Sequence, residues 1–235
     1  MIVNALAPPS PHNQILCKYG GSRMSTQDKV KELESSMLNA VLQEYGFRRK
    51  KKMFYSREKG ECTQSIILLD SKIKGQDRVY LGIAYGISYA EIMPYICYLE
   101  GFKYDKNDTI IRMNLTNLVK EVSPYGYYID EKSDLETIVK DIIEKIQKYV
   151  VPIWNDNETL RDFMLHMDNK ESGLGFVDKE WIFLALALKN APNTCKEVLK
   201  EYQSNIEHSS KRHFAVGLES RIQRYIENGN RFPQI

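Results

Sequence analysis

The fold of this chain is decided by residues 45–55, Tyr45-Gly46-Phe47-Arg48-Arg49-Lys50-Lys51-Lys52-Met53-Phe54-Tyr55. An apolar pattern with helical spacing ends at Gly46, and an alternating pattern begins at Met53. Between them stand five consecutive cations, which we call the basic run (residues 48–52). We interpret the basic run as the joint between a first helix and a sheet, and as a candidate contact surface for an anionic partner.

The composition is that of an ordinary globular protein. The chain has 235 residues, of which 43% are hydrophobic, so it can form one core, or one core and a smaller helical appendage. The net charge of +2 is unevenly distributed: +6 over residues 1–78, −7 over residues 79–180 and +3 over residues 181–235. The basic end favours an anionic partner and the acidic middle favours a basic one, and neither excess requires nucleic acid.

The cysteine pattern and the hydropathy predict the cellular compartment of the protein. Cys17, Cys62, Cys97 and Cys195 include no CxxC pair, so the sequence predicts neither a zinc ribbon nor a disulfide framework. No apolar run reaches the roughly 18–20 residues of a membrane span. We therefore expect a soluble cytoplasmic protein that has no contact with a membrane.

Residues 1–23 are polar, aperiodic and interrupted by proline and glycine, and Met24 stands directly before a helical pattern. We expect this segment to be a disordered arm, unless the true start of the protein is Met24.

Periodicity predicts the elements of an α+β domain over residues 24–152. Apolar residues spaced by three and four from Val30 to Tyr45 predict a helix, which Ser25 or Thr26 caps and Gly46 stops. A hairpin follows over residues 53–69, and a clear strand over residues 79–87. The small residues on one face of this strand, Gly82, Ala84 and Gly86, favour the close approach of a helix or of another backbone over space for a ligand.

The remaining pattern predicts a helical end to the chain. Residues 109–115 and 126–129 are strand candidates, and Ser133 opens a capping box before a helix that Pro152 closes. Beyond Pro152 we expect only helices, over residues 157–167, 178–190, 194–208 and 211–228. The predicted architecture is an antiparallel sheet packed against amphipathic helices, followed by a helical subdomain over residues 153–235.

The order of several short motifs resembles a known family. Tyr45-Gly46-Phe47, the basic run, Phe54-Tyr55, the hairpin and the strand at Leu81-Gly82-Ile83 resemble the uncharacterised bacterial domain of unknown function 4304, over about residues 25–150. The resemblance implies an α+β domain with an antiparallel sheet and without established catalytic residues. Related small domains are often immunity or defence proteins, and this link is one of analogy.

No motif of a catalytic, cofactor-binding or metal-binding site accompanies this pattern, so we assign no residue to such a site. Two charged surfaces are candidate contacts instead. The basic run (Arg48, Arg49, Lys50, Lys51 and Lys52) either contacts phosphates or an acidic protein, or is a solvated joint that stabilises the end of the preceding helix. Acidic residues also gather near the helix at Ser133, and we call Glu131, Asp134, Asp141 and Glu144 the acidic set. Acids there either stabilise a helix N-terminus or form a surface that captures a basic toxin.

We therefore expect a non-catalytic cytoplasmic interaction protein without a cofactor, such as an immunity protein that neutralises a basic toxin through the acidic set. The alternatives are a nucleic-acid-associated defence protein that uses the basic run, and an uncharacterised enzyme. The sequence leaves open the identity of the partner and the oligomeric state.

Overall fold

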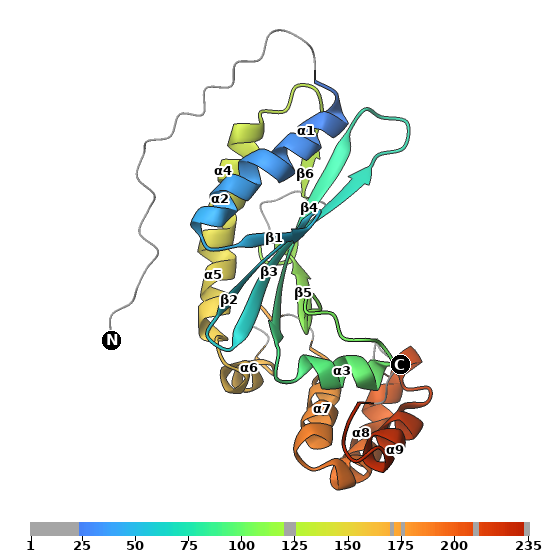
Figure 1. Ribbon diagram of the computed structural model, residues 1–235. Coiled ribbons are helices and arrows are strands. Elements are labelled where there is room, and N and C mark those ends of the chain that lie inside the picture. Colours follow the sequence, from blue (N-terminus) through green and yellow to red (C-terminus); the bar gives the residue numbers. More distant parts are fainter. Residues whose placement is uncertain (1–23, 120–125, 170–171, 175–176, 209–211, 233–235) are drawn as a thin grey trace, which may run out of the picture.

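The computed structural model describes residues 24–119, 126–169, 172–174, 177–208 and 212–232. The arm predicted over residues 1–23, including Cys17, lies outside these residues. Within them the chain forms an antiparallel sheet with helices on one face and a group of C-terminal helices at one end (Figure 1). The predicted α+β class, with its antiparallel sheet and helical end, is confirmed.

The first helix is continuous from Thr26 to Glu44. It comprises α1 (Thr26–Glu32), the π-helical η1 (Leu33–Leu38) and α2 (Asn39–Glu44). The Ser25 hydroxyl accepts a hydrogen bond from the backbone N–H of Asp28, which caps the first turn as predicted. Gly46 ends the helix with a φ of 81°, a left-handed conformation that glycine adopts without a steric cost.

The sheet has six strands among the described residues. They are β1 (Arg48–Lys51), β2 (Phe54–Lys59), β3 (Cys62–Lys72), β4 (Val79–Tyr89), β5 (Ile111–Asn114) and β6 (Tyr127–Ile129). The order is β1-β2-β3-β4-β5, and β6 also pairs with β4, beyond the end of β5. The basic run is thus not a joint: four of its five residues form the edge strand β1, whose side chains are all exposed.

The two faces of the sheet belong to different hydrophobic clusters. The odd-numbered residues of β4 join the main hydrophobic cluster, to which the first helix and the helix after β6 also contribute. We call this the inner face. The opposite, outer face carries a separate cluster of Phe54, Ile67 and Ala84, with Leu69 packed against it. The predicted close approach is seen in part: at Gly86 an added Cβ would lie 3.0 Å from the backbone oxygen of Ile111 in the neighbouring strand, whereas at Gly82 the nearest atoms belong to side chains.

The helix after β6 corrects two predictions. It runs through α4 (Leu135–Lys145), the π-helical η3 (Ile146–Val150) and α5 (Val151–Asp156). Its N-cap is Asp134, because the Ser133 hydroxyl accepts a hydrogen bond from the N–H of Asp130 instead. Pro152 does not close the helix, because it lies in the first turn of α5, where η3 has already changed the hydrogen-bond register.

The C-terminal helices pack at one end of the sheet beside α3 (Met93–Glu100). They are α6 (Leu160–His166), α7 (Lys179–Asn190), α8 (Cys195–His208) and α9 (Leu218–Glu227). α3 contacts α7 and α9, and one hydrophobic cluster extends from Val30 to Tyr225. This packing brings the N-terminus of α7 to the end of the sheet's outer face.

Candidate functional site

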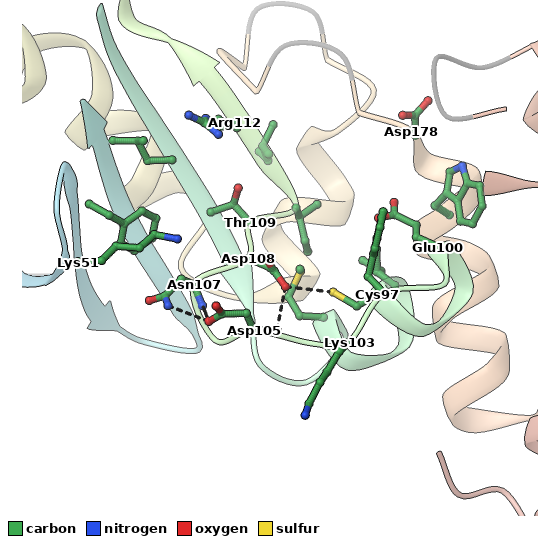
Figure 2. Close-up of a pocket in the computed structure, with 18 of the residues that line it drawn as sticks. Lys51, Cys97, Glu100, Lys103, Asp105, Asn107, Asp108, Thr109, Arg112 and Asp178 are labelled. Carbon is green, nitrogen blue, oxygen red and sulfur yellow. Dashed lines mark hydrogen bonds between the residues drawn. The ribbon is translucent and has the colours of Figure 1, made fainter. Parts of the chain in front are cut away.

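A groove of about 800 Å³ lies where the outer face of the sheet meets α3 and α7. Its walls come from β1, β2, β3, β5, the segment between α3 and β5, α3 itself and the start of α7. Figure 2 shows Lys51 on the sheet side, Glu100 and Asp178 on the helix side, and the turn of residues 105–109 between them. We refer to this feature as the groove.

The part of the groove that lies on the sheet is apolar. Phe54, Ile67 and Leu69 line it from two neighbouring strands, and they form the cluster that is separate from the main core. The register places Phe54 opposite Ile67, so their side chains lie on the same face. The groove therefore has an apolar floor on the face of the sheet that the first helix does not cover.

Cations border this floor. Lys51 and Lys52 line the groove at the end of β1, and Arg112 lines it from β5. Lys51 Nζ lies 5.3 Å from the centroid of the Phe54 ring, in a cation–π contact. Among the described residues, Lys52 and Arg112 form no ion pair. These side chains are available to an anionic group.

The acids of the groove are already engaged within the protein. Asp108 accepts hydrogen bonds from the N–H of Asp105, at 2.8 Å, and from the thiol of Cys97. Asp105 in turn accepts two hydrogen bonds from Asn107, one from its N–H and one from its amide group. Glu100 and Asp178 also interact with other groups of the chain. The groove is therefore divided by charge, with cations on the sheet side and carboxylates on the side of the 105–109 turn, α3 and α7.

Trp181 forms part of the wall on the helix side. Its side chain is 1% exposed, and its Nε1–H is buried without a hydrogen-bond acceptor among the described residues. An unsatisfied buried donor costs about 1–3 kcal/mol. This donor lies beneath the wall, where a partner in the groove does not reach it.

The position of Lys51 and Lys52 is fixed by a buried carboxylate that the sequence reasoning missed. Glu34 lies in η1 with its side chain 3% exposed, and Arg49 donates two hydrogen bonds to it, at 2.7 and 2.8 Å. The same carboxylate accepts hydrogen bonds from the N–H of Met53, at 3.0 Å, and from the hydroxyl of Tyr55. Met53 has a φ of 62°, which is rare for residues other than glycine. Glu34 therefore clamps both ends of the β1–β2 turn that carries the two lysines.

A signal for Glu34 exists in the sequence. It stands four residues after Val30 and four before Leu38, on the apolar stripe of the first helix. An acid at such a position is buried with the stripe and needs a partner. Arg49, one of the five predicted anion contacts, is that partner, whereas Arg48 and Lys50 are exposed and do not line the groove.

The acidic set lies on another surface, at the start of α4 and along it. Asp134 caps α4, and hydrogen bonds from the side chain and N–H of Thr137 lower its pKa. Burial raises the pKa of Asp141, but hydrogen bonds from Lys145 and Tyr127 outweigh this effect, so that the pKa is lowered. Glu144 forms an exposed ion pair with Lys140, at 3.9 Å, and Glu131 is exposed in the turn before the helix.

Two further kinds of site were sought. Within the described ranges, no group of three or more His, Cys, Asp or Glu side chains is placed to hold a metal ion. The described helices also include none that is long and apolar enough to span a bilayer.

Comparison with known proteins places the sheet and most of the groove in a defined family region. The model of the "Domain of unknown function (DUF4304)" matches residues 38–156, about half of the chain. No curated protein and no solved structure matches the chain significantly. The matched region contains all six strands, α3 and α4, whereas Glu34 and α7 lie outside it.

Proposed function

This chain belongs to the DUF4304 family, a domain of unknown function, and we propose that it is a non-catalytic interaction protein that binds a segment of a protein partner in the groove. The observation that carries this proposal is the apolar floor on the outer face of the sheet, bordered by cations without an ion pair among the described residues. Leu69 is the partly exposed residue of this floor, whereas Phe54 and Ile67 are 5% and 8% exposed, and apolar side chains next to unpaired charge are typical of a recognition surface.

The composition of the groove favours a polypeptide over nucleic acid. Four acids line it, namely Glu100, Asp105, Asp108 and Asp178, and they would repel nucleic acid, which carries a phosphate at every nucleotide, whereas a polypeptide can present its charges on one side of the groove only. Of the basic run, only Lys51 and Lys52 line the groove, whereas nucleic-acid binding needs a wider patch. A polypeptide presents apolar side chains and charges of both signs, which match the floor and the two kinds of border.

The test uses matched changes on β3. We would identify the partner by affinity purification from the native cell and then measure its binding to purified variants by calorimetry. Leu69→Asn removes an apolar contact from the floor and should weaken binding by about tenfold, which corresponds to about 1.4 kcal/mol. Ser71→Asn changes an exposed residue of the same strand and face, outside the groove, and should have no effect. Equal binding by the wild type and Leu69→Asn would refute the proposal.

A second candidate is the neutralisation of a basic toxin by the acidic set, in the manner of an immunity protein. The observation in its favour is that Glu131 is exposed in the turn before α4 and that Glu144 is exposed near the end of that helix. Complementary charge would accelerate such an association. Replacing both residues with lysine tests this candidate on the same purified partner. Loss of binding in this variant, with full binding by Leu69→Asn, would select the acidic set over the groove.

The buried thiols of Cys62, Cys97 and Cys195 fit a partner met in a reducing compartment, and we propose the cytoplasm. Fractionation of the native cell would show the protein in the soluble fraction under this proposal.

A further inference from the structure

We infer that the segment bound in the groove is an extended acidic peptide with an apolar anchor residue. This inference rests on the proposed function and specifies its partner. In this arrangement the anchor lies on Phe54, Ile67 and Leu69, and the acidic side chains of the peptide face Lys51, Lys52 and Arg112. The peptide runs from the sheet side of the groove towards Trp181.

Charge determines the acidic character of the peptide. On the sheet side the available charges are the ammonium and guanidinium groups, because Arg49 of the same run is paired with Glu34. On the other side the groove is lined by carboxylates, of which Asp105 and Asp108 accept hydrogen bonds from neutral groups of the protein. The acidic side chains of the peptide therefore lie at the sheet side, because the carboxylates at the other side of the groove keep their charge and would repel them. A basic peptide would have to compete with those hydrogen bonds and would face Lys51 and Lys52.

The contact between Lys51 and Phe54 links charge recognition to the apolar floor. Phe54 is 5% exposed, and the Lys51 ammonium lies over its ring. A cation–π contact at such a site contributes only about 0.5–1 kcal/mol, whereas the ammonium forms a stronger, charge-assisted hydrogen bond with a carboxylate. A carboxylate of the peptide would therefore draw Lys51 from the ring and expose Phe54 to the anchor residue.

The sheet side of the groove needs little rearrangement to bind an extended segment. The Glu34 clamp holds the β1–β2 turn before binding, so little conformational entropy is lost when Lys51 and Lys52 engage the peptide.

Selection from a random library of peptides of about ten residues, about 30 Å when extended, tests the inference without knowledge of the natural partner. The bait is the immobilised full-length chain, and the selected peptides are then synthesised and titrated. We expect the enriched peptides to combine acidic residues with a neighbouring large apolar residue. Their binding should change the tryptophan fluorescence of the wild type, but not that of Trp181→Phe, since the other tryptophan, Trp154, is buried under the inner face of the sheet.

The control variants separate the groove from general attraction to the basic run. The double variant K51E/K52E should weaken binding of the enriched peptides by about tenfold or more. The double variant R48E/K50E makes the same change of net charge on the same strand, outside the groove, and should bind within about twofold of the wild type. Equal losses in the two variants would overturn the inference, because the attraction would then be non-specific.

Failure of this inference can be distinguished from failure of the proposed function. Enrichment of neutral or basic peptides whose binding is lost in Leu69→Asn overturns the acidic character and leaves the groove in place. Enriched peptides that bind Leu69→Asn and Trp181→Phe as well as the wild type overturn the groove itself. The inference also fails if no acidic peptide is enriched, if oligothymidylate binds more tightly than the best peptide, or if the chain forms a dimer through the groove that Leu69→Asn disrupts.

Discussion

The clamp at Glu34 makes an asymmetric prediction for stability. Glu34 and Arg49 form one ion pair, but the Glu34 side chain is 3% exposed and that of Arg49 is 38% exposed. Removing Arg49 leaves a carboxylate without its counterion in the core. Removing the charge of Glu34 leaves a guanidinium that water can still reach. We therefore expect Arg49→Met to be more destabilising than Glu34→Gln, although both substitutions break the same pair.

The expected magnitudes follow from burial. Removing one partner of a buried ion pair costs about 3–5 kcal/mol when the other charge remains buried, and this is the range for Arg49→Met. For Glu34→Gln the cost is smaller, about 2–3 kcal/mol, because Arg49 can regain solvent and the new amide oxygen can still accept hydrogen bonds from Met53 or Tyr55. In a chain of this length each kcal/mol lowers Tm by about 2–4 °C.

Urea unfolding followed by circular dichroism measures both variants, with free energies obtained by linear extrapolation. The double variant E34Q/R49M should be more stable than the sum of the two single losses predicts, because neither charge is then left alone. Lys140→Met, which breaks the exposed pair with Glu144, is the control and should cost less than about 1 kcal/mol. The reasoning is wrong if Arg49→Met costs no more than Glu34→Gln, or if both cost as little as the control.

Three further predictions concern the sheet, the thiols and the tyrosines. Gly86→Ala should lower the free energy of unfolding by about 1–3 kcal/mol, because its Cβ would lie 2.6 Å from Ser65 Oγ. Gly82→Ala should cost less in the same urea experiment, since its nearest neighbour, at 3.2 Å, is the end of a tyrosine side chain. Burial raises the pKa of the Cys62 and Cys195 thiols to about 11, so both should resist iodoacetamide in the native protein near pH ~8 and react after unfolding. Alkylation of either thiol in the native protein, detected by mass spectrometry, would contradict this prediction. Burial also raises the pKa of four tyrosine hydroxyls in the folded chain, so their contribution to the free energy of unfolding should be constant below pH ~10 and fall as the pH rises further. Phenolate absorbance from these residues that precedes unfolding would disprove this prediction. The four tyrosines are Tyr55, Tyr85, Tyr89 and Tyr127.

Local periodicity predicted the elements that bury one face. The strand at residues 79–87 alternates large apolar and small residues because only its odd positions reach the main core, and the alternation alone identifies it. The first helix was predicted from its stripe in the same way. The strand β1 was missed because an edge strand with four exposed cations has no apolar alternation, and its charges serve instead to keep other strands from pairing with it.

The candidate site depends on contacts that local patterns do not contain. The groove brings Phe54 and Ile67 together with the turn at residues 105–109 and with Trp181. Trp181 lies more than a hundred residues after Ile67 in the sequence. The sequence therefore predicted the basic run as a contact surface but not its division, in which Arg49 turns inward to Glu34 while Lys51 and Lys52 border the groove. That division follows from the irregular pairing of β1 with β2 between Arg49 and Lys51, because strict alternation would place these two residues on the same face.

The limits of the family region divide the groove into two parts with different implications. Lys51, Phe54 and Arg112 lie within residues 38–156, whereas Trp181 lies outside them. Under the inferred mode of binding, the capture of an acidic segment by the sheet is the contribution of the family domain, and the wall that includes Trp181 is an addition made by the C-terminal helices. The contacts of the partner with the cations are electrostatic, whereas its contacts with the apolar floor are not. Raising the salt concentration should therefore weaken the first and leave the second largely intact, so that the loss caused by K51E/K52E shrinks with added salt while the loss caused by Leu69→Asn persists.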